Sequence, residues 1–234
     1  MTYVFEPAPR ASVAVAGEAA RFPVRRIFCV GRNYAAHARE MGKDPDREPP
    51  FFFTKPADAV VDAGANAGAE IPYPPETQNL HHEIELTVAI GKGGTDIPVE
   101  QALDHVFGYA ASIDLTRRDL QFAARDKGRP WDWGKAFDNS APIAPIHRVA
   151  EVGHPSRGRI WLSVDGDIRQ DGDLDELIWP VPDVISILSR SMALKAGDLI
   201  MTGTPAGVGA IEPGQHVRGG VAGLGDVAIT IAAV

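Results

Sequence analysis

A strict two-residue alternation from Glu83 to Ile90 is the feature that most constrains how this chain folds. In a β-strand, successive side chains point to opposite faces, so alternate residues share a face. One face of this segment is apolar, and the other begins with two acidic residues, Glu83 and Glu85, followed by Thr87. The segment is therefore predicted to be a strand that carries two carboxylates side by side.

Two explanations account for this acidic pair. The simpler is a solvated sheet face, since acidic side chains are seldom buried without partners. The other is a divalent metal site built from oxygen ligands. Asp114 favours the second, because it ends the apolar segment 107–115 and a buried aspartate is costly unless it is paired or ligating. His81 and His82 are alternative ligands, although ordinary hydrogen bonds at the start of the strand are the simpler role for them.

A short helix is predicted over residues 33–42, with Asn33 as its N-cap and Gly42 at its end. His37 and Glu40 share a face of this helix because they are three residues apart. They form either an exposed ion pair, worth roughly a few tenths of a kcal/mol, or a carboxylate that orients an imidazole acting as general base. Together with the charged, proline-rich residues 43–50, the helix is typical of a lid.

Two further segments carry groups that suit a site. Lys135 lies in the aromatic segment 131–138, which is predicted to be a loop or a strand. It either contacts an aromatic ring or stabilises negative charge that develops on a substrate oxygen. The glycine-rich segment 203–209 is a turn whose backbone N–H groups are also able to bind a carboxylate.

The remaining patterns favour strands over helices. A hairpin is indicated by Asp165 and Gly166 between two alternating segments. Strands are predicted at 12–15, 27–30, 51–55, 160–164, 167–170 and 199–202, and helical segments at 99–105, from 116 onward and at 182–192. Since strands and helices do not alternate regularly, the predicted fold class is α+β, mostly β, instead of a doubly wound sheet.

Charge and composition exclude several classes of partner. The chain has 234 residues and a formal net charge of −8, which argues against nucleic acid or an anionic membrane as a partner. Cys29 is the single cysteine, so an intrachain disulfide is impossible, and a reducing compartment is expected. Neither a secretion signal nor a membrane span is recognisable. We expect a cytoplasmic protein.

Taken in order along the chain, these motifs resemble the fumarylacetoacetate hydrolase family, in particular its small fumarylpyruvate and acylpyruvate hydrolases. The resemblance extends over roughly residues 25–230, and each motif is weak alone whereas the ordered set is specific. The motifs are Val30-Gly31-Arg32-Asn33-Tyr34 with His37 and Glu40, Phe53-Thr54-Lys55-Pro56, His81-His82-Glu83-Ile84-Glu85-Leu86, Asp114-Leu115-Thr116-Arg117-Arg118-Asp119, Lys135-Ala136-Phe137-Asp138-Asn139-Ser140 and Gly197-Asp198-Leu199-Ile200-Met201-Thr202-Gly203-Thr204-Pro205.

The resemblance implies a mixed β/β/α fold with a partly open β-roll, usually as a homodimer. A short strand segment at 1–24 would precede a catalytic domain at 25–234. The implied site binds Mg²⁺ or Mn²⁺ through Glu83, Glu85 and Asp114. It also has a catalytic pair on a lid, His37 and Glu40, and a lysine beside the metal, Lys135. The implied substrate contacts are Arg32, Arg118, Gln121 and Thr204.

The implied reaction is hydrolysis of the C3–C4 bond of a 2,4-dioxo acid, for example fumarylpyruvate to fumarate and pyruvate, a step of aromatic catabolism. Oxaloacetate decarboxylation is the alternative, because the same site would stabilise the same pyruvate enolate. An isomerase–decarboxylase of the same fold is a second alternative, against which His37 and Glu40 count. A metal-binding scaffold without activity would explain the carboxylates but not the dyad and Lys135 together.

Overall fold

Strand β8 (Ile84–Ile90) lies in the interior and is buried on both faces. The computed structural model describes residues 2–40, 49–64 and 68–233, without the side chains of residues 38–40. Leu86 and Val88 belong to the main core, whereas Ala89 packs with Met201 in a second apolar cluster on the opposite side. A solvated polar face on this strand is therefore wrong, because the second cluster and the elements around Glu85 cover that face.

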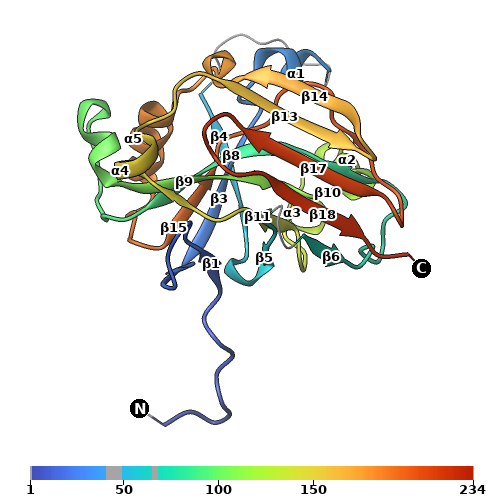
Figure 1. Ribbon diagram of the computed structural model, residues 1–234, viewed down its shortest axis with the longest axis horizontal. Helices are drawn as coiled ribbons and strands as arrows, with labels where there is room; N and C mark the ends of the chain where they lie inside the picture. Colours follow the sequence, from blue (N-terminus) through green and yellow to red (C-terminus); the bar gives the residue numbers. More distant parts are fainter. Residues whose placement is uncertain (1, 41–48, 65–67, 234) are drawn as a thin grey trace.

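The large sheet is organised around β8, which pairs antiparallel with β9 (Val106–Ile113) on one side and with β15 (Asp198–Met201) on the other. Most of its pairings are antiparallel, but β15 runs parallel to its other neighbour (Figure 1). Its spatial order is β4 (Phe51–Lys55), β3 (Arg26–Gly31), β15, β8, β9, β11 (Ala141–Ile143) and β5 (Val60–Asp62), with β12 (His147–Arg148) paired to β9.

A second sheet covers the apolar face of β8 and β9. Its strands β13 and β17 contact those two strands, and the main apolar core lies between the sheets. Its spatial order is β14 (Asp167–Asp173), β13 (Arg159–Val164), β17 (His216–Val221), β18 (Val227–Ile231) and β6 (Ala69–Ile71). The curved sheets form a partly open β-roll, so the predicted mostly-β α+β class is confirmed.

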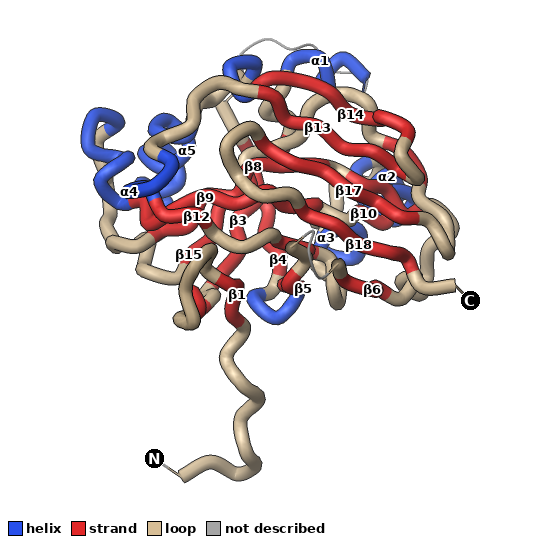
Figure 2. Tube along the Cα trace, viewed as in Figure 1, coloured by secondary structure: helices blue, strands red, loops and turns tan. Residues whose placement is uncertain are grey.

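Two small sheets complete the β structure (Figure 2). One consists of β10 (Thr116–Arg117), β7 (Leu80–His82) and β16 (Gly209–Ala210), and it brings the loop after β15 close to the start of β8. The other is the hairpin of β1 (Ser12–Ala14) and β2 (Arg21–Pro23), which covers the second cluster. Residues 2–10 extend away from the body of the protein (Figure 2) and expose Tyr3, Val4 and Phe5.

The helices are short (Figure 2). No helix in the described ranges has the length and apolar character needed to cross a bilayer. The α-helices are α1 (Ala35–Glu40), α2 (Arg118–Arg125), α3 (Asp132–Lys135), α4 (Val149–Val152) and α5 (Val181–Ser191), and the 3₁₀ segments are Ala57–Ala59, Val99–His105 and Leu174–Glu176.

Several local expectations are confirmed. The β13–β14 hairpin turns at Asp165 and Gly166, whose φ angles of 52° and 92° are those of the two-residue turn that an Asp-Gly pair favours. The predicted helix at 182–192 corresponds to α5. The 3₁₀ helix at Val99–His105 corresponds to the helical turns expected there.

Others require correction. Asn33 does not cap α1: its side-chain amide donates to the carbonyls of Trp179 and Thr202, and its Oδ1 accepts from the Trp179 N–H. Gly42 and residues 43–48 of the expected lid loop lie outside the described residues.

The segment 131–138 contains helix α3 where a loop or strand was expected. A glycine permits this, because a Cβ on Gly134 would lie 2.8 Å from the backbone nitrogen of Gln121 in α2.

Candidate metal centre and active site

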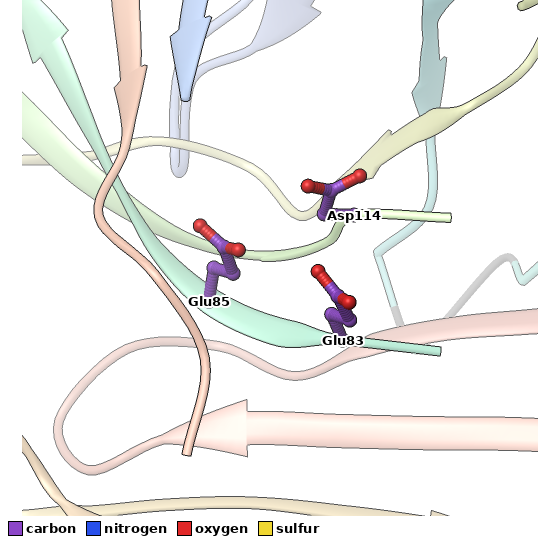
Figure 3. A group of neighbouring side chains, drawn as sticks. All are labelled: Glu83, Glu85 and Asp114. Carbon is purple, nitrogen blue, oxygen red and sulfur yellow. The ribbon is translucent and has the colours of Figure 1, made fainter. Parts of the chain in front are cut away.

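Three carboxylates converge where β8 begins and β9 ends (Figure 3). Glu83, Glu85 and Asp114 each offer one oxygen, and these oxygens lie within 4.8 Å of one another. All three residues are buried, with at most 4% of their surface exposed. The acidic pair predicted on one strand and the aspartate predicted at the end of another therefore meet at one point.

The pairing of β8 with β9 accounts for this convergence. The N–H of Asp114 donates to the carbonyl of Glu83 at 2.8 Å, which continues the antiparallel register beyond the two strands. The loop after β15 orients the third carboxylate, because the N–H of Gly203 donates to Glu85 Oε2 at 2.7 Å. Gly203 has φ 102°, and a Cβ there would lie 2.8 Å from the Cβ of Asn33, so only glycine fits.

Buried cations surround the carboxylates. Lys135 Nζ donates to Glu83 Oε2 and to Asp114 Oδ2, both at 2.7 Å. Lys55 Nζ lies 2.9 Å from Asp114 Oδ1, and Arg118 forms an ion pair with Glu83. Charges buried this deeply are tolerated only when they are paired, so these contacts are a condition for folding as well as part of the site.

The pKa values of two glutamates differ because their partners differ. Burial raises the pKa of Glu85 well above its usual value, and repulsion from Asp114 and Glu83 adds to this effect. Burial opposes ionisation of Glu83 too, but Lys135 and Arg118 outweigh it and hold the pKa of Glu83 well below its usual range. Glu85 forms no ion pair with a described residue, so it is the carboxylate that an added cation would stabilise most.

The donor set fits a divalent metal ion. Asp114 Oδ1 is buried and has no hydrogen-bond donor among the described residues; Lys55 Nζ is within ion-pair distance of it but directs hydrogen bonds to the carbonyls of Leu115 and Lys135. An unsatisfied buried carboxylate oxygen is expected where a ligand is to bind. Because all three donors are carboxylates, Mg²⁺ or Mn²⁺ suits this site better than zinc.

Glu83 and Glu85 line a pocket of about 510 Å³, open solvent at its mouth included, and Lys135, which bonds to Asp114, lines it too. The pocket combines acidic, basic and aromatic side chains, which suits a polar anionic ligand. Its lining consists of Val30, Gly31, Arg32, His37, Phe53, Glu83, Glu85, Arg118, Gln121, Phe122, Arg125, Trp131, Lys135, Gly203 and Thr204.

His37 lines this pocket from helix α1 and is 7% exposed. It is near enough to Glu83 for its charge to help lower the pKa of that carboxyl. The side chain of Glu40 lies outside the described residues, although the three-residue spacing within α1 places both positions on one helical face. The structure thus brings the expected base to the pocket, and the pairing with Glu40 stays a prediction.

The four expected substrate contacts all line the pocket. Arg118 Nη1 donates to Gln121 Oε1 at 2.6 Å, so the two side chains act as one unit at the start of α2. Thr204 Oγ1 accepts a hydrogen bond from the amide of Gln170 at 2.8 Å, which leaves its own O–H free to donate to a ligand. Arg32 contributes a cationic group from the end of β3.

Lys135 makes an aromatic contact, but not with the tryptophans that flank it in sequence. Its Nζ lies 5.1 Å from the ring centroid of Phe53 on β4. The two histidines considered as ligands have ordinary hydrogen bonds instead: His81 with Asn79 at 2.9 Å and His82 with Gln170 at 3.0 Å. The metal-ligand group in the described residues is therefore purely acidic.

Sequence reasoning left several site residues without a role. Lys55 ends the strand predicted at 51–55, and a charged residue at the end of an apolar segment is the signal that marks it. Thr116 accepts a hydrogen bond from Lys135 at 2.6 Å, and Phe122, Arg125 and Trp131 line the pocket. Their roles depend on tertiary packing, for which no local pattern exists.

The fold and the acidic pocket together define the class of protein. The family described as fumarylacetoacetate (FAA) hydrolase C-terminal matches residues 26–232, and this chain belongs to the fumarylacetoacetate hydrolase family. It is similar over its whole length to the fumarylpyruvate hydrolase of Pseudomonas aeruginosa, solved in complex with Mn²⁺ and pyruvate. The two chains are 55% identical, each is covered completely, and the TM-score is 0.98.

Curated relatives indicate a second chemistry within the same family. The mitochondrial oxaloacetate tautomerase FAHD2 of Oryza sativa subsp. japonica is 44% identical over 202 residues, which cover 86% of this chain and 88% of the relative. The mitochondrial oxaloacetate decarboxylase of Dictyostelium discoideum is 42% identical over 200 residues, which cover 86% and 90%. Relatives of this chain are therefore named for two kinds of reaction, hydrolysis of a dioxo acid and conversion of oxaloacetate.

Proposed function

We propose that this protein is a Mn²⁺- or Mg²⁺-dependent hydrolase that cleaves the C3–C4 bond of acylpyruvates, with fumarylpyruvate as its substrate. The observation that carries the proposal is the buried group Glu83, Glu85 and Asp114, two of which line a pocket together with His37 and Lys135. Full-length similarity to a fumarylpyruvate hydrolase bound to Mn²⁺ and pyruvate supports this choice of metal and product.

Binding of the pyruvate half of the substrate is the first task of the site. Glu83, Glu85 and Asp114 would hold the metal ion, which would supply Lewis-acid stabilisation of the negative charge that develops on the substrate. Arg118 and Gln121 offer a guanidinium and an amide to the C1 carboxylate, and Arg118 already forms an ion pair with a carboxylate in this pocket. The hydroxyl of Thr204 donates to a substrate oxygen from the opposite loop.

The bond is then broken by water. His37 accepts a proton from the water as its oxygen adds to C4, and Glu40 orients the imidazole and stabilises its charged form. The C3–C4 bond breaks, its electron pair moves toward the 2-oxo oxygen, and the ammonium of Lys135 stabilises the resulting enolate. The imidazolium of His37 returns the proton to C3, which gives pyruvate and the carboxylic acid of the acyl group.

Oxaloacetate is the second candidate substrate, since relatives at 42–44% identity are named for its tautomerisation and decarboxylation. The same groups would stabilise the enolate of pyruvate with CO₂ as the leaving group. We prefer hydrolysis because decarboxylation does not require an activated water molecule. Decarboxylation would therefore give the buried His37, which lines the pocket, no role as a general base.

Purified protein should be assayed with Mn²⁺ on fumarylpyruvate, acetylpyruvate and oxaloacetate, with loss of each substrate and release of pyruvate both measured. We expect the largest kcat/KM for fumarylpyruvate. A larger kcat/KM for oxaloacetate, from either tautomerisation or decarboxylation, would overturn the proposal and support the second candidate.

We also propose a cytoplasmic homodimer that acts in aromatic catabolism. Pyruvate and fumarate are products expected at the end of ring degradation, and the single cysteine, Cys29, suits a reducing compartment. Exposed Tyr3, Val4 and Phe5 support self-association, because large apolar side chains are seldom left in solvent together. Light scattering on the purified chain tests the dimer, and a monomer at micromolar concentration would contradict it.

A further inference from the structure

One face of helix α2 runs along the pocket from the acidic centre outward. Arg118, Gln121, Phe122 and Arg125 all line the pocket, and their positions are i, i+3, i+4 and i+7. Residues with this spacing lie on the same side of a helix. The face therefore presents one arginine at each end, with the amide and the aromatic ring between them.

The two arginines have different environments. Arg118 is buried, forms an ion pair with Glu83, and belongs to the centre described above. The side chain of Arg125 is 33% exposed and lies at the outer end of the face. The ring of Phe122 separates them, with its centroid 5.8 Å from Cζ of Arg118 and 4.3 Å from Cζ of Arg125.

Arg125 is held in place but keeps capacity for a ligand. Its guanidinium lies over the Phe122 ring, and its Nε and Nη2 are each 2.9 Å from Oδ1 of the neighbouring Asp126, which is 62% exposed. An exposed ion pair of this kind contributes little to stability, so a ligand carboxylate is able to replace it at small cost. The remaining N–H groups of the guanidinium are free to donate at the same time.

A further cation lines the same pocket from another element. Arg32 lines the same pocket from the end of β3, with its Cζ 5.2 Å from the ring centroid of Phe51. It forms no ion pair with a carboxylate in the described part of the chain. Besides Arg118, the pocket thus has two guanidinium groups that lie over aromatic rings, and such groups are suited to binding a carboxylate.

The length of the helical face selects among possible ligands. Seven residues of α-helix rise about 10 Å, so the two arginines are anchored far apart. An extended chain covers about 3.5 Å in three bonds, so the carboxyl carbons of a four-carbon diacid are about 3.5 Å apart and those of a seven-carbon diacid about 7 Å apart. When both acids are held at Arg118, the seven-carbon acid therefore reaches about 3.5 Å further along the face toward Arg125 than the four-carbon acid does.

We propose that Arg125 is the specificity-determining residue, which binds the distal carboxylate of a seven-carbon dioxo diacid while the 2-oxo acid end occupies the acidic centre. This inference rests on the proposed function and narrows its substrate class from acylpyruvates in general to those whose acyl group ends in a carboxylate. It also accounts for discrimination against acetylpyruvate, which lacks that group, and against oxaloacetate, which is too short.

The test uses ligands that bind without being cleaved. Binding of 2-oxoheptanedioate, a seven-carbon 2-oxo diacid, and of 2-oxopentanoate, which lacks the distal carboxylate, is measured by calorimetry on the Mn²⁺-loaded protein. Arg125→Gln should raise the dissociation constant of the diacid about 10- to 100-fold and leave that of the monoacid unchanged. Arg125→Lys should recover part of the loss, since it restores the charge but not the forked geometry.

Arg129→Gln is the matched control, because it removes the same charge from an exposed residue shortly after α2 that does not line the pocket. It should change neither dissociation constant. Equal changes for both ligands in Arg125→Gln, or no change for either, would overturn the assignment. Pyruvate release from fumarylpyruvate by the unmodified protein is measured in parallel: its absence would overturn the proposed function, while the ratio of the two dissociation constants still decides the role of Arg125.

Discussion

The backbone N–H of Asp114 donates to the backbone carbonyl of Glu83 at 2.8 Å, and this bond brings together two carboxylates that are 31 positions apart in sequence. The bond lies one residue beyond the β8–β9 ladder, in which Ile84 pairs with Ile113. The geometry of the proposed metal centre is therefore fixed by sheet register, which a buried strand cannot change without exposing its core face.

Glu85→Gln separates the metal-binding role of this residue from a structural one. Because burial and the neighbouring carboxylates raise the pKa of Glu85, its charge is unfavourable in metal-free protein. With chelator present, the variant should melt at the same temperature as the parent or higher. The rise that saturating Mn²⁺ gives the parent, about 5–10 °C for ion at one hundred times its dissociation constant, should be largely lost. An undiminished rise would show that Glu85 is not a ligand.

His37→Ala tests the general base. The change should lower kcat for fumarylpyruvate by about 10²- to 10⁴-fold, the usual contribution of a positioned acid–base group. The metal-induced rise in melting temperature should be retained, since His37 is not a member of the acidic group. A variant with an altered KM and an unchanged kcat would show that His37 only binds substrate.

Lys55→Met tests whether the buried lysine compensates Asp114. Asp114 would keep its bond from Lys135 but lose its second cationic partner, so a loss of up to about 3–5 kcal/mol in the free energy of unfolding is expected. The double variant with Asp114→Asn should be less destabilised than the sum of the single variants, as chemical denaturation would measure. Strict additivity of the two effects would contradict direct coupling.

Asp119 provides a pH-dependent test of how the segment before β7 is held. Burial is the largest single effect and opposes its ionisation, but hydrogen bonds from Thr77 and from the N–H groups of Gln78 and Leu120 together outweigh burial and lower the pKa of Asp119. A lowered pKa stabilises the folded state above the pKa of the unfolded chain, and this contribution is lost as the pH falls through the lower folded value.

At neutral pH, Asp119→Ala should therefore reduce stability by about 1 kcal/mol, or about 2–4 °C in melting temperature. The difference between parent and variant should shrink as the pH is lowered below the normal aspartate range near 4. Melting curves between pH 3 and pH 7 measure this, and a difference that grows toward low pH would contradict the assignment.

Much of the centre was predictable because its ligands lie on strands with a clear period. The alternation from Glu83 to Ile90 predicts that the two glutamates lie on the same face of a strand. The position of Asp114 at the end of an apolar segment predicts that it is a third ligand. Alternation alone, however, does not tell a solvated face from a covered one. Burial of Glu85 depends on β15 and its following loop, which are more than one hundred residues away in sequence.

Other features could not be predicted from local patterns. Asn33 has the residue type of an N-cap, but its amide instead connects the loop at Trp179 to the one at Thr202. Helix α3 has only four residues, and its packing against α2 rather than its propensity determines it. The role of Arg125 depends on which face of α2 lines the pocket, and the packing of α2 in the folded protein determines that face.

Cleavage of the substrate should depend on a metal ion held by the three carboxylates. Pyruvate release from fumarylpyruvate is followed for the parent and for Asp114→Asn, first after exhaustive chelation and then after Mn²⁺ is added back. The parent should lose its activity on chelation and regain it with Mn²⁺, whereas Asp114→Asn should stay inactive at the same Mn²⁺ concentration. Undiminished pyruvate release by the chelated parent, or full restoration of the variant, would contradict the proposed metal centre.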